Sequence, residues 1–217
     1  IIEHGYDEGA DGSIEKMDKA ANELDGKIKQ QWVTDAVTEA KALVGMTMLE
    51  GYASTRGAGL FAHRGAGARF ECGLTRPDAR EDLGTFGLCQ GAGVGPRGFA
   101  GGGLGALSSA GDDAVLRSGY MSQGMGYWRA AGVLALRGDR LDVRGRRYVQ
   151  GAGVHTGVGA VRYEGSSSTF RVWGVGPGFG WDYGVGLFHG VGPANRLASE
   201  WAAARGDINA VGLTRLT

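Results

Sequence analysis

The sequence predicts an α/β fold, and two observations near its beginning support this. Apolar residues recur every three or four positions between Ser13 and Leu43, which is typical of amphipathic helices. The short apolar stretch Met46 to Glu50 follows, and it predicts a buried strand that ends in a carboxylate. Helices, a glycine and a buried strand in succession indicate an α/β arrangement rather than an all-β one.

The N-terminal part predicts two helices in turn. The first begins at Ser13 and its apolar pattern continues to Ile28, with Gly26 as a candidate break. One face of this helix carries the apolar residues Ile14, Met17, Ala21, Leu24 and Ile28. The second helix spans Trp32 to Leu43 and ends at Gly45, a natural C-cap.

After Arg56 the apolar residues follow a period of two. Large apolar residues occupy most odd positions from Trp173 to Leu187, and glycines occupy most even ones. Similar alternation occurs in "FGLCQGAGVG" and "VQGAGVHTGVGAV". The pattern predicts strands with one bulky and one bare face, and bare faces suit close backbone packing or the lumen of a small barrel. We find no repeat of fixed period, which argues against a solenoid or a propeller.

Length and composition limit the possible architectures. At 217 residues we expect a single domain over residues 1–217, with residues 1–30 as an N-terminal helical extension. The 23 basic and 23 acidic side chains cancel, so no global positive field attracts nucleic acid. Glycine is 43 of the 217 residues, yet little proline or serine accompanies it, which argues against disorder.

The cysteines favour a reducing compartment, and the hydropathy predicts no membrane helix; if the protein is exported, its signal is already removed. Cys72 and Cys89 lie in no CxxC or zinc-ligand spacing, so we expect buried free thiols in a reducing compartment. No apolar run approaches the length of a membrane helix, and the first residues lack the basic and apolar regions of an export signal.

Most familiar catalytic motifs are absent from the sequence. It contains no GxSxG nucleophile elbow and no GxxxxGK[ST] phosphate loop. No metal site is predicted, because no histidine pair has the i,i+4 spacing; the four histidines are His4, His63, His155 and His189. Asp112 and Asp113 indicate a helix start more than a metal-binding pair.

Two segments are candidate functional sites, and each also has a purely structural interpretation. Glu50 ends a buried strand, where the catalytic groups of α/β barrels lie, although solvated loop glutamates are commoner. In "LFHGVGPAN", Leu187 to Asn195, a glycine-rich turn separates a strand-like from a helix-like stretch. Such a turn either offers backbone N–H groups to a phosphate or is an ordinary turn.

Several short stretches, in order, resemble the 2-keto-3-deoxy-6-phosphogluconate aldolase family. They are "MDKAANELD", "DAVTEAKALVGMTMLE", "LCQGAG", "GYWR" and "GVGPAN", and together they cover roughly a third of the chain. The resemblance implies a (β/α)8 barrel and a class I aldolase. Such an enzyme cleaves a phosphorylated 2-keto-3-deoxy sugar acid to pyruvate and a triose phosphate.

The resemblance also implies site residues and partners. It makes Glu50 the general acid/base, and it makes Arg56 a ligand of the substrate's anionic end. Gly190, Val191 and Gly192 would bind the phosphate through their N–H groups. The partner is then a small phosphorylated keto acid, without metal, organic cofactor, nucleic acid or membrane, in a cytoplasmic enzyme that could be a homo-oligomer.

The chain departs from that family at the Schiff-base lysine. The family carries this lysine on a Phe-Lys-x-Phe-Pro strand, and the corresponding stretch here reads "YWRAAGVLA". No lysine follows Lys41, so the Schiff-base lysine is not found.

The main alternative is an all-β small outer-membrane barrel. The run from Phe179 to Leu216 resembles the closing strands of such a barrel, with bulky residues toward lipid and glycines inward. This interpretation implies a structural or pore role in the outer membrane. It accounts for the alternation but not for the N-terminal helices. A soluble glycine-rich β domain with an unknown binding role is a third possibility.

Overall fold

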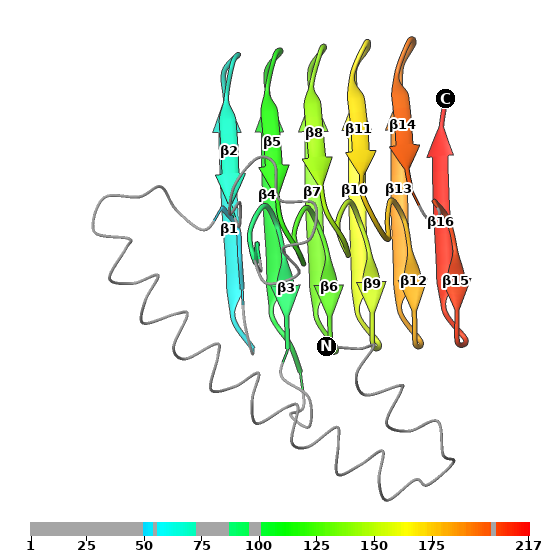
Figure 1. Cartoon of the computed structure of the whole chain (residues 1–217). Coiled ribbons are helices and arrows are strands. Elements are labelled where there is room, and N and C mark those ends of the chain that lie inside the picture. Colours follow the sequence, from blue (N-terminus) through cyan, green and yellow to red (C-terminus); the bar gives the residue numbers. More distant parts are fainter. Residues whose placement is uncertain (1–49, 54–55, 73–86, 96–100, 201–202) are drawn as a thin grey trace, which may run out of the picture. The chain divides into compact units, whose positions relative to one another are not determined.

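A computed structural model describes residues 50–53, 56–72, 87–95, 101–200 and 203–217 (Figure 1). All of them belong to one compact unit, Leu49–Thr217. No helix occurs among the described residues, so none there could cross a membrane. The predicted helices between residues 13 and 43, and the extension 1–30, lie outside the described ranges.

The described chain forms three parallel sheets, in which each turn of the chain adds one strand to each sheet. The six-stranded sheet holds the long strands β1 (Ala58–Arg64), β4 (Leu104–Ala110), β7 (Ala131–Arg137), β10 (Val158–Glu164), β13 (Val185–Val191) and β16 (Val211–Leu216). The second sheet holds β2 (Arg69–Cys72), β5 (Val115–Ser118), β8 (Asp142–Gly145), β11 (Thr169–Val172) and β14 (Arg196–Ser199). The third holds β3 (Gly93–Val94), β6 (Gly126–Tyr127), β9 (Gly153–Val154), β12 (Gly180–Trp181) and β15 (Gly206–Asp207). The unit is therefore a parallel β-solenoid.

The solenoid has a sequence period of 27 residues. Strand partners step from Leu104 to Ala131, then to Val158 and Val185, and many side-chain hydrogen bonds join residues 27 apart. The first step, from Ala58 to Leu104, is 46 residues, because extra residues interrupt that turn. The expectation that no fixed-period repeat exists is wrong, since this longer first turn and the abundant glycine conceal the repeat.

Both fold predictions are wrong for the described residues. A (β/α)8 barrel needs helices between its strands, and here the strands follow one another through turns. A small outer-membrane barrel pairs its strands antiparallel, whereas every strand pairing described here is parallel. The α/β interpretation rested on residues 13 to 50, and the helical pattern does not recur after them.

The alternating run from Trp173 to Leu187 is not one continuous strand. β11 ends before Trp173, β12 supplies two residues, and β13 begins at Val185. Residues with positive φ turn the chain between these strands: Gly176, Gly178, Asp182 and Tyr183. Asp112 and Asp113 likewise lie in the turn between β4 and β5, so the predicted helix start there is wrong.

The second residue of every long strand is an inward glycine that faces backbone. These residues are Gly59, Gly105, Gly132, Gly159, Gly186 and Gly212. A Cβ on Gly132 would lie 2.0 Å from the carbonyl oxygen of Met125, just before β6. The first and third sheets therefore meet backbone to backbone along this edge. The sequence-based interpretation of the bare faces as sites of close backbone packing is confirmed here.

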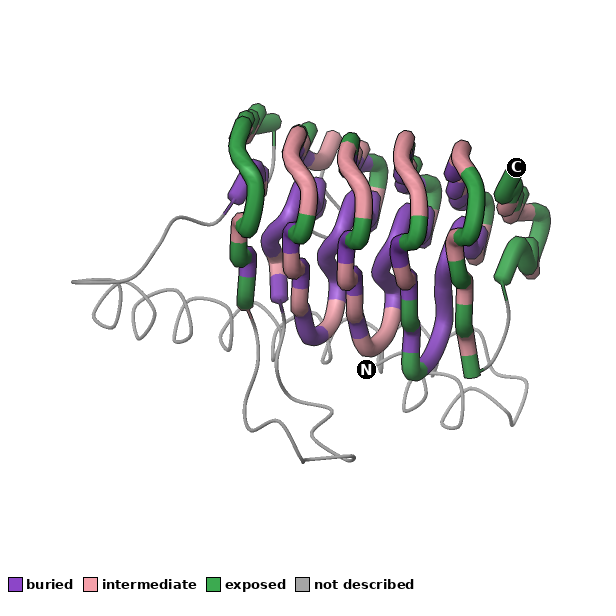
Figure 2. The backbone as a smooth tube through the Cα atoms, turned by 90° about the horizontal axis from the view of Figure 1, so that it is seen from above, coloured by how far each residue is buried: buried purple, intermediate pink, exposed green. Residues whose placement is uncertain are grey.

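The apolar core lies between the first and second sheets. The long strands contribute one buried column, Leu107, Leu134, Val161 and Phe188, and the second sheet contributes Phe70, Leu116, Val143 and Phe170. The rings of Phe170 and Phe188 meet edge to face, with centroids 5.1 Å apart. Figure 2 shows the buried residues continuing through the middle turns, so each turn packs on the next through the same positions.

Replacing an inward glycine tests the close packing of the first sheet on the backbone of the third. We expect Gly132→Ala to lower stability by about 3 kcal/mol, because the added methyl group meets a carbonyl that cannot move without the sheet. The melting temperature, followed by circular dichroism, should fall by roughly 6–12 °C. Gly174→Ala is the matched control, since its Cβ would approach its nearest neighbour at 3.1 Å. Equal melting temperatures for the two variants would contradict the backbone-to-backbone packing.

Candidate functional site

A column of glutamines runs along the inside of the solenoid. Gln90, Gln123 and Gln150 are fully buried and occupy the same place in successive turns. The N–H of the glycine that follows Gln123 donates to the Gln90 carbonyl in a hydrogen bond that recurs one turn further on. Gln123 Nε2 also donates to Gln90 Oε1 at 3.1 Å. Because buried amides require partners, these residues fix the stacking of the turns at this corner.

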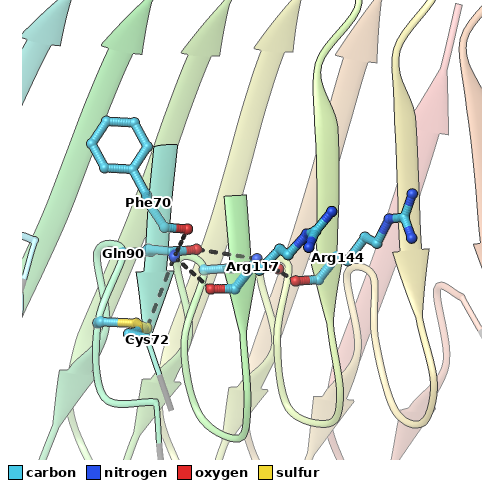
Figure 3. The surroundings of a disulfide bond; sticks show 7 residues. Phe70, Cys72, Gln90, Arg117 and Arg144 are labelled. Carbon is cyan, nitrogen blue, oxygen red and sulfur yellow. Dashed lines mark hydrogen bonds between the residues drawn. A yellow bond between two sulfur atoms is a disulfide. The ribbon is translucent and has the colours of Figure 1, made fainter. Parts of the chain in front are cut away.

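Each glutamine also holds the backbone of one outward-facing arginine. Gln90 Nε2 donates to the Arg117 carbonyl at 3.0 Å, as Figure 3 shows. The equivalent bonds are Gln123 to Arg144, at 2.9 Å, and Gln150 to Arg171, at 3.2 Å. The inner amide column therefore sets the position of an arginine column on the outside.

The arginine column, Arg117, Arg144 and Arg171, lies on the outer face of the second sheet. Arg117 pairs in register with Arg144, and Arg144 with Arg171. Parallel strands lie about 4.8 Å apart, so the three side chains leave the sheet at that interval. Figure 3 shows the side chains of Arg117 and Arg144 pointing away from the buried amide of Gln90.

Few carboxylates accompany these arginines. Asp142 Oδ1 lies 2.7 Å from Arg144 Nε, and Asp142 Oδ2 lies 3.9 Å from Arg117 Nη2. Glu71 Oε1 lies 4.0 Å from Arg117 Nη1. Among the described residues, Arg171 makes no ion pair. The strands of this sheet place outward five arginines, Arg69, Arg117, Arg144, Arg171 and Arg196, against the two acids Asp142 and Glu71. This face is basic although the whole chain has no net charge.

An exposed aromatic ring adjoins the arginine column. Trp173 follows β11 and is 43% exposed. By strand alternation it faces outward two residues beyond Arg171. A large exposed indole beside a row of guanidinium groups is a surface suited to ligand binding.

The glutamine column ends in a glutamate. Gly91 N–H donates to the Glu50 carbonyl, as the corresponding glycine does to Gln90 one turn later. Glu50 is 6% exposed, and its Oε2 has no hydrogen-bond partner among the described residues. Burial raises the pKa of Glu50 to about 7. A carboxylate thus stands where the other turns have an amide.

The two cysteines form a disulfide, contrary to the expectation of free thiols. Cys72 ends β2 and Cys89 precedes Gln90, and their Cα atoms lie 6.7 Å apart (Figure 3). The bond closes a separation of 17 residues, which restricts the unfolded chain and stabilises the fold by about 3 kcal/mol. The sequence could not show this pairing, since it depends on how the first complete turn winds.

The residues assigned by the aldolase resemblance do not gather in one place. Glu50 is inside the solenoid, whereas Arg56 is exposed at a turn before β1. Gly190 and Val191 lie in β13, four strands away from β1 in the first sheet, and Gly192 N–H donates to the Thr217 carbonyl. At about 4.8 Å per strand, β13 and β1 are roughly 19 Å apart. Their catalytic, substrate-binding and phosphate-binding roles stay predictions.

A second side-chain cluster joins three successive turns, and no motif in the sequence indicates it. His155 Nδ1 lies 2.5 Å from Asp182 Oδ2, and the Trp128 ring stacks on the imidazole with centroids 4.5 Å apart. These residues stand 27 apart, as do those of the arginine column. The 27-residue spacing of like or complementary residues, once recognised, would have found both groups.

Comparison with protein-family models, curated sequences and solved structures finds no match. The aldolase family assignment is therefore wrong: no family model supports it and the fold is a β-solenoid. The stretches "LCQGAG", "GYWR" and "GVGPAN" lie at corners of the solenoid, where glycines and positive φ angles turn the chain. Glycine-rich corners and glycine-rich phosphate loops have similar compositions, which accounts for the resemblance.

The buried carboxylate makes the stability depend on pH. Its pKa is about 7 in the folded chain against 4.5 for an ordinary glutamate, so the unfolded state ionises first as the pH rises. Relative to Glu50→Gln, the free energy of unfolding of the wild type should fall as the pH rises from 4.5 to 7. Above pH 7 it should stay below that of the variant. We expect the variant to be more stable by about 3 kcal/mol at pH 8 and nearly equal at pH 4.5.

Urea unfolding of the oxidised protein, with a chelator present, measures this difference. Glu71→Gln, which removes a partly exposed carboxylate, is the control and should follow the wild type. A Glu50→Gln variant whose advantage does not change between the two pH values would refute the buried-acid account.

Proposed function

We propose that this protein binds an extended acidic polysaccharide along the arginine column. The observation that carries the proposal is the placement of Arg117, Arg144 and Arg171 at one outward position in three consecutive turns. The column runs along the solenoid axis with a charge about every 4.8 Å. A linear polymer with regularly spaced carboxylate or sulfate groups can engage all three guanidinium groups together.

The electrostatics of the column favour a ligand. Like charges directly opposite one another on a sheet are destabilising, and two carboxylates offset only part of this column. Arg171, at the end nearest Trp173, has no ion pair among the described residues. An anionic chain would supply the missing negative charge, which a neutral ligand could not.

The surroundings of the column favour a sugar polymer over a nucleic acid. Glu71 and Asp142 stand among the arginines, where their oxygens can accept hydrogen bonds from sugar hydroxyl groups, which a DNA backbone lacks. Trp173 offers a flat apolar surface on which a sugar ring can pack.

The glutamine column makes this surface rigid. Each arginine carbonyl accepts a hydrogen bond from a buried amide, at 2.9 to 3.2 Å. The backbone beneath the ligand is therefore ordered before binding, and less conformational entropy is lost on association.

Binding to polygalacturonate, a uronic acid polymer, tests the proposal by isothermal titration calorimetry. Replacing Arg117, Arg144 and Arg171 together by glutamine should weaken binding at least about 30-fold, equivalent to about 2 kcal/mol. The matched control replaces Arg64, Arg137 and Arg162, which face outward on the first sheet, and removes the same charge. This control should change the affinity less than about threefold.

Three outcomes would contradict the proposal. The two triple variants could lose affinity equally, which would indicate unspecific charge attraction. Neutral dextran could bind as well as polygalacturonate, which would exclude the arginines as the determinants. Single-stranded DNA could bind more tightly than polygalacturonate at the same salt concentration, which would assign the face to nucleic acid.

A further inference from the structure

The disulfide and the buried glutamate form a cluster that the polysaccharide surface does not use. Glu50, Cys72 and Cys89 each place one ligand atom within 4.8 Å of the other two. Glu50 and Cys89 are buried, and Cys72 is half-buried. The three residues come from different turns or strand ends, so the winding of the chain brings them together.

The unpartnered carboxylate oxygen indicates what the cluster lacks. Glu50 Oε2 is buried and has no hydrogen-bond partner among the described residues, as is also true of Gln123 Oε1 and Gln150 Oε1. The glutamines, however, are neutral and donate through Nε2, whereas a carboxylate has no amide donor. A buried carboxylate is stable when it is protonated, paired or coordinated to a cation. No described basic side chain pairs with Glu50, and its nearest potential ligand partners are the two sulfur atoms.

We propose that reduction of the Cys72–Cys89 disulfide converts this corner into a binding site for a divalent cation of the zinc type. Two thiolates and a carboxylate are ligands that Zn²⁺ takes in proteins, and a water molecule completes a four-coordinate site. Oxidation removes both sulfur ligands, so binding depends on the redox state. Gln90 Nε2, 3.8 Å from Cys72 Sγ, can donate to the thiolate and support its charge.

The redox step is an ordinary exchange with a dithiol reductant. Two electrons pass to the disulfide, the reductant becomes a disulfide, and Cys72 and Cys89 become thiols. Zn²⁺ then displaces the thiol protons, which are released to solvent. Either the S–S bond or the metal joins the same two positions of the chain, so the closure of the first complete turn persists in both states.

Zinc titration of the full chain tests this inference. Protein reduced with a phosphine and protein left oxidised are each titrated with Zn²⁺ against a chromophoric chelator. We expect one Zn²⁺ per chain in the reduced protein and none in the oxidised protein. Cobalt in place of zinc should give a thiolate-to-metal charge-transfer band in the reduced protein.

Variants identify the ligands. Cys72→Ser should abolish stoichiometric binding, and Glu50→Gln should weaken it at least about tenfold. Glu50→Gln keeps the shape of the side chain and matches the glutamines of the following turns, so folding is expected. The control, Glu71→Gln, removes the carboxylate next to Cys72 in sequence and should leave the affinity unchanged. Absence of zinc binding by the reduced wild type, equal binding by the oxidised protein, or unchanged affinity in Glu50→Gln would overturn the proposal.

Discussion

Every other feature of this structure depends on the in-register stacking of parallel turns. Each residue lies above its counterpart one turn earlier, so one position in the 27-residue period becomes one column of side chains. The inward glycines make this stacking possible where the first and third sheets meet, because no side chain fits between Gly132 and the Met125 carbonyl. Where the sheets separate, phenylalanine, leucine and valine fill the space. These inward glycines therefore reflect the geometry of one edge, whereas others, such as Gly111 and Gly138, have positive φ and turn the chain.

The buried glutamine column fixes the position of the arginine column on the surface. A glutamine amide inside the corner holds the carbonyl of an arginine whose side chain faces solvent, and the arrangement recurs in three turns. The same coupling explains why Glu50 is exceptional. It continues the glutamine column but supplies a carboxylate, which has no amide N–H to donate and lies beside the disulfide. The arginine surface and the Glu50–Cys72–Cys89 cluster are thus consequences of one repeated corner.

The sequence alone predicted local features better than the fold. Alternation correctly indicated strands with a bare face, because inward glycines and bulky residues alternate along β13 and its equivalents. It did not reveal the three-strand turn, since short strands joined by residues with positive φ, such as Asp182, read as one long strand. Glu50 was singled out for its position after an apolar stretch, whereas its real setting depends on Cys72 and Cys89 from the following turn. The arginine column was missed because its members are 27 residues apart and form a pattern only after the chain has wound.

Cysteine cross-linking of neighbouring turns tests this register most directly. Ala135→Cys and Arg162→Cys are direct partners on the outer face of the first sheet, at about 4.8 Å between Cα atoms, which a disulfide can bridge. Ala135→Cys and Glu164→Cys face the same way but are displaced by two residues, at about 8 Å, beyond the usual limit. Under mild oxidation, mass spectrometry should find an intramolecular bond in the first pair and not in the second. Equal cross-linking of both pairs, or preferential cross-linking of the displaced pair, would contradict the 27-residue stacking and the arginine column that follows from it.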